Sequence, residues 1–176
     1  MKFLVFQHVP HEHPGLITKY ASSKGIGLDV VELWKPYRIP SVSGYDALII
    51  MGGPVGVYDS KELYPSKDDE LAAINEAIGK IPVLGICLGS QILAHAIGAN
   101  VYPNTKDGRS VKEIGYYEVE LTADGVMDPI FRGFSSPVKV LQWHGDAFDL
   151  PKGSELLATS PYCRNQAFSH GNAYGL

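Results

Sequence analysis

The chain has 176 residues, of which 45% are hydrophobic and 19% charged, so we expect a single domain over residues 1–176 with one sizeable core. Its net charge of −4, without any run of Lys or Arg, argues against nucleic acid or an anionic membrane as the main partner. No stretch reaches the ~20 apolar residues that span a bilayer, and residues 1–9 lack the length and cleavage site of a signal peptide, so a cytoplasmic protein is expected. Two cysteines cannot form a disulfide framework, and in a reducing compartment both would be thiols.

The first half of the chain alternates strands and helices. Strands are predicted at residues 2–8, 28–34, 45–53 and 82–87, and helices at residues 16–25, 64–79 and 90–99. The helix predicted at residues 64–79 carries Ser66 at the N-cap position and acids in its first turn. This alternation predicts an open, mostly parallel α/β sheet with helices on both faces and ligands at the carboxyl ends of its strands.

The second half of the chain has a different pattern. Residues 113–121 alternate polar and apolar side chains, and residues 138–146 and 165–176 are also strand-like. These segments favour a few antiparallel strands added to the main sheet.

Cys87 lies in the stretch GICLG, residues 85–89, where a predicted strand runs directly into a predicted helix. A nucleophile at such a turn is lifted out of the sheet, and the helix N-terminus is expected to lower the thiol pKa and to supply donors for an oxyanion. Glycines on both sides allow a strained turn and a close approach of substrate. The alternative is a buried, unreactive cysteine in a Gly-rich turn, and the elbow alone leaves both readings open.

A second Gly-rich segment follows the strand at residues 45–53. Backbone N–H groups in IIMGGPVGVYD, residues 49–59, could complete an oxyanion hole with the N–H of Leu88, although an ordinary strand-end turn has the same composition. Tyr58 and Asp59 follow this loop, where they could gate substrate access or be surface residues.

Histidines near the N-terminus form a tempting metal cluster. His8, His11 and His13 lie close to Glu12 in a Pro-bounded segment, but no Cys or second acid is nearby, so a solvated loop is favoured over a site. Because it follows the first strand, this loop could approach the mouth of an active site. We predict no metal and no cofactor.

Three further residues have ordinary structural explanations. His95 is expected to be a packed or half-exposed helix residue, His170 to face solvent in a turn, and Cys163, which lacks flanking glycines, to be an inert thiol.

Several segments together resemble the class I glutamine amidotransferases, in particular stand-alone proteins similar to the amidotransferase domain of GMP synthase. The segments are GGP at 52–54, GICLGSQILAHAIGA at 85–99, QWHGDAFDLPKGSELLATS at 142–160 and NQAFSHGNAYGL at 165–176. The resemblance covers nearly the whole chain and implies a flavodoxin-like fold. It also implies a glutaminase half-reaction, in which the Cys87 thiolate attacks the side-chain amide of glutamine, ammonia leaves and water hydrolyses a γ-glutamyl thioester.

The resemblance also implies roles for individual residues. The N–H groups of Gly53 and Leu88 would hold the oxyanion, and Gln91 would contact glutamine. The main chain of Gly145 and Asp146 would bind the α-amino and α-carboxylate groups of the substrate. Ammonia would pass to an acceptor on a partner, expected to be a synthase subunit.

The chain departs from the family pattern in one respect. The family base is a His followed two residues later by Glu, in a segment of the form GLQFHxE, and the sequence ends at Leu176 where that segment begins. We therefore expect a chain truncated before this segment rather than a natural short form. His144, followed by Asp146, imitates a His-x-acid pair, but the matching family segment binds substrate through its backbone, so His144 is expected to be structural or to line the substrate site.

Two other functions remain open. The elbow could belong to a cysteine hydrolase of another γ-glutamyl compound. Without its base, the chain could also be a non-catalytic protein that binds glutamine or a regulatory partner.

Overall fold

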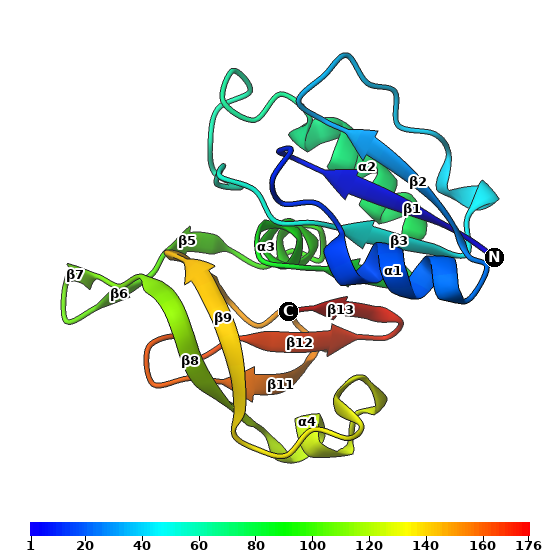
Figure 1. The fold of residues 1–176 in the computed structure, drawn as a ribbon. Coiled ribbons are helices and arrows are strands. Elements are labelled where there is room, and N and C mark those ends of the chain that lie inside the picture. Colours follow the sequence, from blue (N-terminus) through cyan, green and yellow to red (C-terminus); the bar gives the residue numbers. More distant parts are fainter.

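The computed structural model describes residues 1–176 and contains one nine-stranded sheet in the order β2-β1-β3-β4-β13-β12-β11-β8-β9 (Figure 1). Its parallel half consists of β1 (Lys2–Gln7), β2 (Gly27–Glu32), β3 (Ala47–Ile50), β4 (Val83–Gly85) and β13 (Ala173–Gly175). Its antiparallel half consists of β12 (Ala167–His170), β11 (Glu155–Thr159), β8 (Glu113–Leu121) and β9 (Val138–His144). The predicted α/β fold is confirmed, and the antiparallel part is larger than a few added strands.

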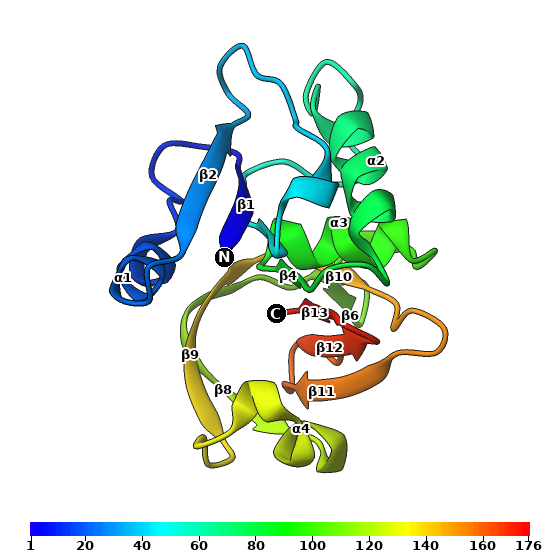
Figure 2. The ribbon, with the colours of Figure 1, turned by 90° about the vertical axis from the view of Figure 1, so that its right-hand side faces the viewer.

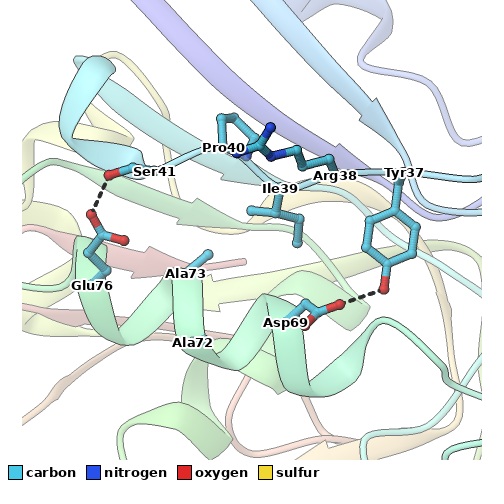
Figure 3. Close-up of a pocket in the computed structure, with 9 residues that line it drawn as sticks. All are labelled: Tyr37, Arg38, Ile39, Pro40, Ser41, Asp69, Ala72, Ala73 and Glu76. Atoms are coloured by element: carbon cyan, nitrogen blue, oxygen red, sulfur yellow. Dashed lines mark hydrogen bonds between the residues drawn. The ribbon is translucent and has the colours of Figure 1, made fainter.

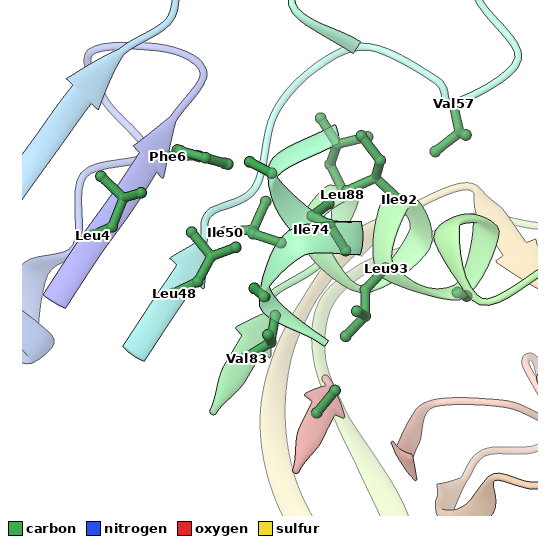
Figure 4. Close-up of a cluster of buried hydrophobic side chains, with 14 of the residues drawn as sticks. Leu4, Phe6, Leu48, Ile50, Val57, Ile74, Val83, Leu88, Ile92 and Leu93 are labelled. Carbon is green, nitrogen blue, oxygen red and sulfur yellow. The ribbon is translucent and has the colours of Figure 1, made fainter. Parts of the chain in front are cut away.

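Helices cover both faces of the parallel half. Helix α1 (Gly15–Ser23) lies on one face, and α2 (Lys67–Ala77) and α3 (Leu88–Ala96) lie on the other (Figure 2). Side chains alternate between the faces, so Leu4 and Phe6 pack in the cluster with α2 and α3 (Figure 4). Val5 packs on the other face, in the cluster that includes Ile17 of α1. This burial on both sides explains why the strands read as nearly continuous apolar runs.

Helix α2 begins three residues later than the pattern predicted. Ser66 occupies the N-cap position, but its side chain makes no cap hydrogen bond and instead donates to Glu70 at 2.7 Å. The acidic first turn of the helix is as expected. The expected capping role of Ser66 is therefore wrong, because its hydroxyl is used to hold a buried carboxyl group.

The second half contains elements that the sequence patterns did not indicate. Strand β5 (Val101–Pro103) pairs with β10 (Asp146–Phe148), and β6 (Thr105–Lys106) pairs with β7 (Arg109–Ser110). The second half also contains α4 (Ala123–Met127) and a short 3-10 helix, η2 (Pro129–Phe131), while another, η1 (Val42–Gly44), precedes β3 in the first half. His170 ends β12 and is half-buried with its Nδ1 3.0 Å from Ser154 Oγ, so the expected solvent-facing turn is wrong. No helix is long and apolar enough to cross a membrane.

The parallel strands bring three loops to one edge of the sheet. His8 follows β1, residues 51–54 follow β3 and Cys87 follows β4. Because β1, β3 and β4 are parallel neighbours, their carboxyl ends meet at this edge. The predicted strand over residues 45–53 ends at Ile50, since the residues after it form the loop.

Candidate active site

Cys87 lies between β4 and α3 with backbone angles φ 55° and ψ −111°, at the N-cap position of the helix. The backbone of any residue other than glycine is strained in this conformation. Hydrogen bonds hold the turn on both sides: Ile86 donates to Ile50 at 2.9 Å, and Cys87 donates to the carbonyl of Leu176 at 2.8 Å. The fold therefore fixes an unfavourable backbone conformation at the candidate nucleophile.

The glycines on either side of the elbow are required by close backbone packing. A Cβ on Gly85 would collide with the carbonyl oxygen of Gly89, and one on Gly89 would collide with the carbonyl oxygen of Ile50. Strand and helix can cross at this distance only without side chains, which agrees with the sequence prediction for the elbow.

Cys87 is half-buried, and desolvation raises the pKa of its thiol above the ordinary value. The N–H of Leu88 hydrogen bonds to the thiol and lowers the pKa, but Glu12 and Asp146 oppose it because their negative charges disfavour a thiolate. The expectation of a lowered pKa is therefore wrong. Desolvation outweighs the hydrogen bond from Leu88, and the two carboxylates add to the rise.

The loop after β3 packs tightly against the elbow. A Cβ on Gly53 would lie 2.8 Å from both His8 Cβ and Leu88 Cδ2. A Cβ on Gly52 would collide with the carboxylate of Glu12 and lie 3.6 Å from Cys87 Cβ. The two residues predicted for the oxyanion hole, Gly53 and Leu88, are thus in adjoining positions beside Cys87.

Glu12 also lies beside the elbow, which no local sequence pattern indicated. The loop after β1 does reach the site mouth, and the Glu12 carboxylate lies over Gly52 and influences Cys87. His11 and His13 are exposed in the same loop, whereas His8 is buried, so the expectation of a solvated loop is wrong for His8 alone. No group of three or more possible ligands is arranged to hold a metal ion.

The residues predicted to bind substrate lie in two segments near the elbow. Gln91 is buried in the first turn of α3, where its N–H donates to the Cys87 carbonyl at 3.1 Å. Gly145 and Asp146 follow β9, and their carbonyls accept hydrogen bonds of 2.8 Å from the N–H of Asn104 and of 3.0 Å from Nδ1 of His144. The thiol donates a long hydrogen bond of 3.8 Å to the carbonyl of Trp143, which ties this segment to the elbow.

Tyr58 bridges the two sides of the site. Its hydroxyl donates to Asp146 Oδ1 at 2.9 Å, which joins the loop after β3 to the segment after β9. Burial, followed by this hydrogen bond, raises the pKa of Tyr58 to about 12. Asp59 accepts from the N–H of Gly56 at 2.7 Å and so shapes the loop. Tyr58 is a surface residue with 52% of its area exposed, as the surface-loop alternative expected, and its hydroxyl makes a contact across the site.

His144 does not face the thiol. Its Nδ1 donates to the carbonyl of Asp146 at 3.0 Å, and its Nε2 lies 3.1 Å from Glu113 Oε2 without the alignment of a hydrogen bond. Glu113 is fully buried and also accepts from Ser160 and Gln166. This arrangement agrees with a structural role for His144.

His95 and Cys163 lie outside the candidate active site. His95 is exposed on α3. Cys163 is buried, its thiol donates to the carbonyl of Asn165, and burial raises its pKa to about 11, as expected of an inert thiol.

One well-defined cavity lies away from the elbow. It has a volume of about 470 Å³ and lies between α2 and the loop before η1 (Figure 3). Two hydrogen bonds span it, from Tyr37 to Asp69 at 2.8 Å and from Ser41 to Glu76 at 2.8 Å. Its lining includes hydroxyl groups and carboxylates but no thiol, so the chemistry at Cys87, and not this cavity, identifies the candidate active site.

Comparisons with known proteins identify the family and the fold of the chain. The family model of class-I glutamine amidotransferases matches residues 15–176. A solved structure of a glutamine amidotransferase from Thermotoga maritima superposes with a TM-score of 0.90 and 37% identity, over 99% of this chain and 74% of that one. These findings confirm the family resemblance and the fold that the sequence motifs predicted.

Two curated relatives match almost the whole chain. The glutamine amidotransferase-like protein YfeJ of Salmonella typhimurium is 33% identical over 173 residues, which are 96% of this chain and 70% of the relative. One subunit of the glutamine-hydrolyzing GMP synthase of Saccharolobus solfataricus is 29% identical over 170 residues, which are 96% of this chain and 81% of the relative. Other GMP synthases also match, and the chain spans between 22% and 30% of their length.

Proposed function

Because the chain belongs to the class I glutamine amidotransferase family, we propose that it releases ammonia from the side-chain amide of glutamine with Cys87 as the nucleophile. The observation that supports this most directly is the strained turn at Cys87, which presents the thiol at the N-terminus of α3 beside the N–H of Leu88. A merely structural cysteine has no need of such a conformation.

The proposed reaction has two covalent steps. Cys87 loses its proton, and the thiolate attacks the amide carbon, which forms a C–S bond and moves an electron pair onto the carbonyl oxygen. The N–H groups of Gly53 and Leu88 stabilise this oxyanion. The pair returns, the C–N bond breaks, and the nitrogen leaves as ammonia after it gains a proton. Water then hydrolyses the γ-glutamyl thioester to glutamate and the free thiol.

The raised pKa of Cys87 means that the first step needs a proton acceptor. The thiol's hydrogen-bond partners, the carbonyl of Trp143 and the N–H of Leu88, are backbone groups and not bases. In the family pattern the base belongs to a His-x-Glu segment that follows the position of Leu176. We propose a histidine of this kind as the proton acceptor for Cys87.

Glutamine is the proposed substrate. The backbone of Gly145 and Asp146 binds its α-amino and α-carboxylate groups, and Gln91 contacts it from α3. For the α-amino group, this assignment is supported by the second lone pair that each of the two engaged carbonyls retains, because a carbonyl oxygen accepts from an ammonium group. The contact from Gln91 is supported by its position one turn after the nucleophile. A site built from such hydrogen bonds would reject an amide that leaves them unpaired.

The ammonia is proposed to pass to an acceptor on a synthase partner, since a relative of similar length is one subunit of a GMP synthase. The cytoplasm is the proposed compartment, because a nucleophilic free thiol requires a reducing environment.

Ammonia release from L-glutamine tests the proposal. The wild-type protein and Cys87→Ala are compared, with Cys163→Ala as the matched control for loss of a cysteine. We expect the activity to disappear in Cys87→Ala and to persist in Cys163→Ala. A preference for γ-glutamyl peptides over glutamine would instead assign a different γ-glutamyl hydrolase.

A further inference from the structure

His8 is buried at the end of β1 and lies against the loop that carries Gly53. Only 4% of its side chain is exposed, and its ring has three polar neighbours. Nδ1 lies 3.0 Å from the carbonyl oxygen of Gly52, and Nε2 lies 3.0 Å from Glu70 Oε2 and 3.2 Å from Tyr64 Oη. Neither the family resemblance nor the proposed reaction assigns a role to this histidine.

The partners of His8 determine which ring nitrogen carries a proton. A carbonyl oxygen can only accept, so Nδ1 must donate to Gly52. Glu70 on α2 is completely buried, and its second oxygen accepts from Ser66 at 2.7 Å. The ring of His8 is therefore held from one side by a fixed carboxyl group and directs its N–H at the Gly52 carbonyl from the other.

The direction of the Gly52 carbonyl decides the direction of the next N–H. In a trans peptide the C=O and the following N–H point in opposite directions, so a carbonyl that faces His8 turns the N–H of Gly53 away from it. That N–H has no backbone acceptor in the fold. Because this peptide joins two glycines, whose backbones tolerate both signs of φ, its own conformational preferences do not prevent it from flipping.

We propose that His8, held by Glu70, is a positioning residue that fixes the Gly52–Gly53 peptide so that the Gly53 N–H is available to the oxyanion formed at Cys87. The inference rests on the proposed function of Cys87 and Gly53. It separates His8 from the loop histidines that follow it, because the ring of His8 acts on the backbone of the site while theirs face solvent.

Two substitutions of His8 separate its contacts. In His8→Asn the side-chain amide nitrogen lies near the position of Nδ1 and can still donate to Gly52. In His8→Gln the amide lies near the position of Nε2, so the contact with Glu70 is replaced while the donor to Gly52 is lost. His95→Gln on the exposed side of α3 is the matched control for loss of a histidine.

The first measurement pairs glutamine hydrolysis with alkylation of Cys87 by iodoacetamide, which forms no oxyanion. Loss of an oxyanion-hole donor costs roughly 100- to 1000-fold in kcat, so its misorientation in His8→Gln is expected to cost roughly 10- to 100-fold with little change in KM. His8→Asn is expected to lose less, and alkylation is expected to stay within twofold in both. Hydrolysis within twofold of wild type in His8→Gln, or a parallel loss of alkylation, overturns the inference.

A second measurement does not depend on turnover. The Cys87 thiol is expected to add to the aldehyde carbon of 5-oxopentanoate and form a hemithioacetal. The oxygen of this adduct occupies the oxyanion position. If the wild-type protein binds this aldehyde but does not hydrolyse glutamine, the proposed function fails. The role of His8 is still supported in that case if His8→Gln binds the aldehyde more weakly than His8→Asn does. Equal affinities in the two variants, or no aldehyde binding by wild type, contradict that role.

Discussion

The N–H of Cys87 donates to the carbonyl of Leu176 at 2.8 Å, and the N–H of Leu176 donates in return to the carbonyl of Gly85 at 2.9 Å. These bonds extend the parallel pairing of β13 with β4 through the elbow. The last residues of the chain therefore help to keep Cys87 in its positive-φ conformation, and the strain is balanced by contacts on both sides of the turn.

Because the backbone at Cys87 is strained, we expect a glycine variant at this position to be more stable than an alanine variant. Cys87→Gly relieves the strain that Cys87→Ala retains, and a residue in such a conformation costs on the order of 1–3 kcal/mol. We expect Cys87→Gly to have the higher free energy of unfolding in urea, by about 1 kcal/mol after the entropy cost of glycine is included. A less stable Cys87→Gly would show that the turn is not strained.

The glycines of the elbow predict a packing effect on stability. Gly89→Ala places a Cβ against the carbonyl oxygen of Ile50, whereas Gly44→Ala meets nothing within 4 Å. We expect Gly89→Ala to lower the free energy of unfolding by more than ~2 kcal/mol and Gly44→Ala to change it by less than ~0.5 kcal/mol. Similar values for the two variants in urea titrations would contradict the close crossing of strand and helix.

The position of Glu12 near Cys87 predicts that replacing its carboxylate shifts the pKa of the Cys87 thiol. Its negative charge helps to raise the pKa of Cys87, so Glu12→Gln should lower that pKa. At any pH below the thiol pKa a larger fraction is then thiolate, and the pH profile of Cys87 alkylation moves to lower pH. Glu118→Gln, on an exposed position of β8, is the control and should leave the profile in place. A profile that moves upward in Glu12→Gln would refute the electrostatic role of this carboxylate.

The hydroxyl of Tyr58 predicts a change in substrate binding. Tyr58→Phe removes the hydrogen bond to Asp146 and frees the loop after β3 from the segment after β9. We expect KM for glutamine to rise severalfold with kcat changed less than twofold, since the hydroxyl does not contact the thiol. Tyr116→Phe, whose side chain is exposed on β8, is the control. An unchanged KM in steady-state assays would show that the contact between Tyr58 and Asp146 does not affect substrate binding.

The sequence was sufficient for the elements whose signal is local. The apolar runs of β1 and β3 and the GICLG elbow were predicted because periodicity and glycine placement act over a few residues. Short strands such as β5 could not be predicted, because their pairing with β10 depends on residues far away in the chain.

The site was only partly predictable for the same reason. The direction of the pKa shift at Cys87 depends on burial and on two carboxylates that the fold brings together. The partners of His8 lie on α2 and in the loop after β3, so its pattern in the sequence resembled that of its solvated neighbours. The pKa of Cys87 and the role of His8 both depend on contacts between segments that are far apart in the sequence, and a local sequence pattern cannot predict such contacts.

The most direct test of Cys87 as the nucleophile is to detect the γ-glutamyl thioester. The protein is mixed with glutamine, quenched rapidly in acid and digested, and the peptide with Cys87 is weighed by mass spectrometry. We expect one γ-glutamyl group on Cys87 in the wild-type protein and none in Cys87→Ala. Ammonia release that continues in Cys87→Ala would contradict this role and place the nucleophile elsewhere.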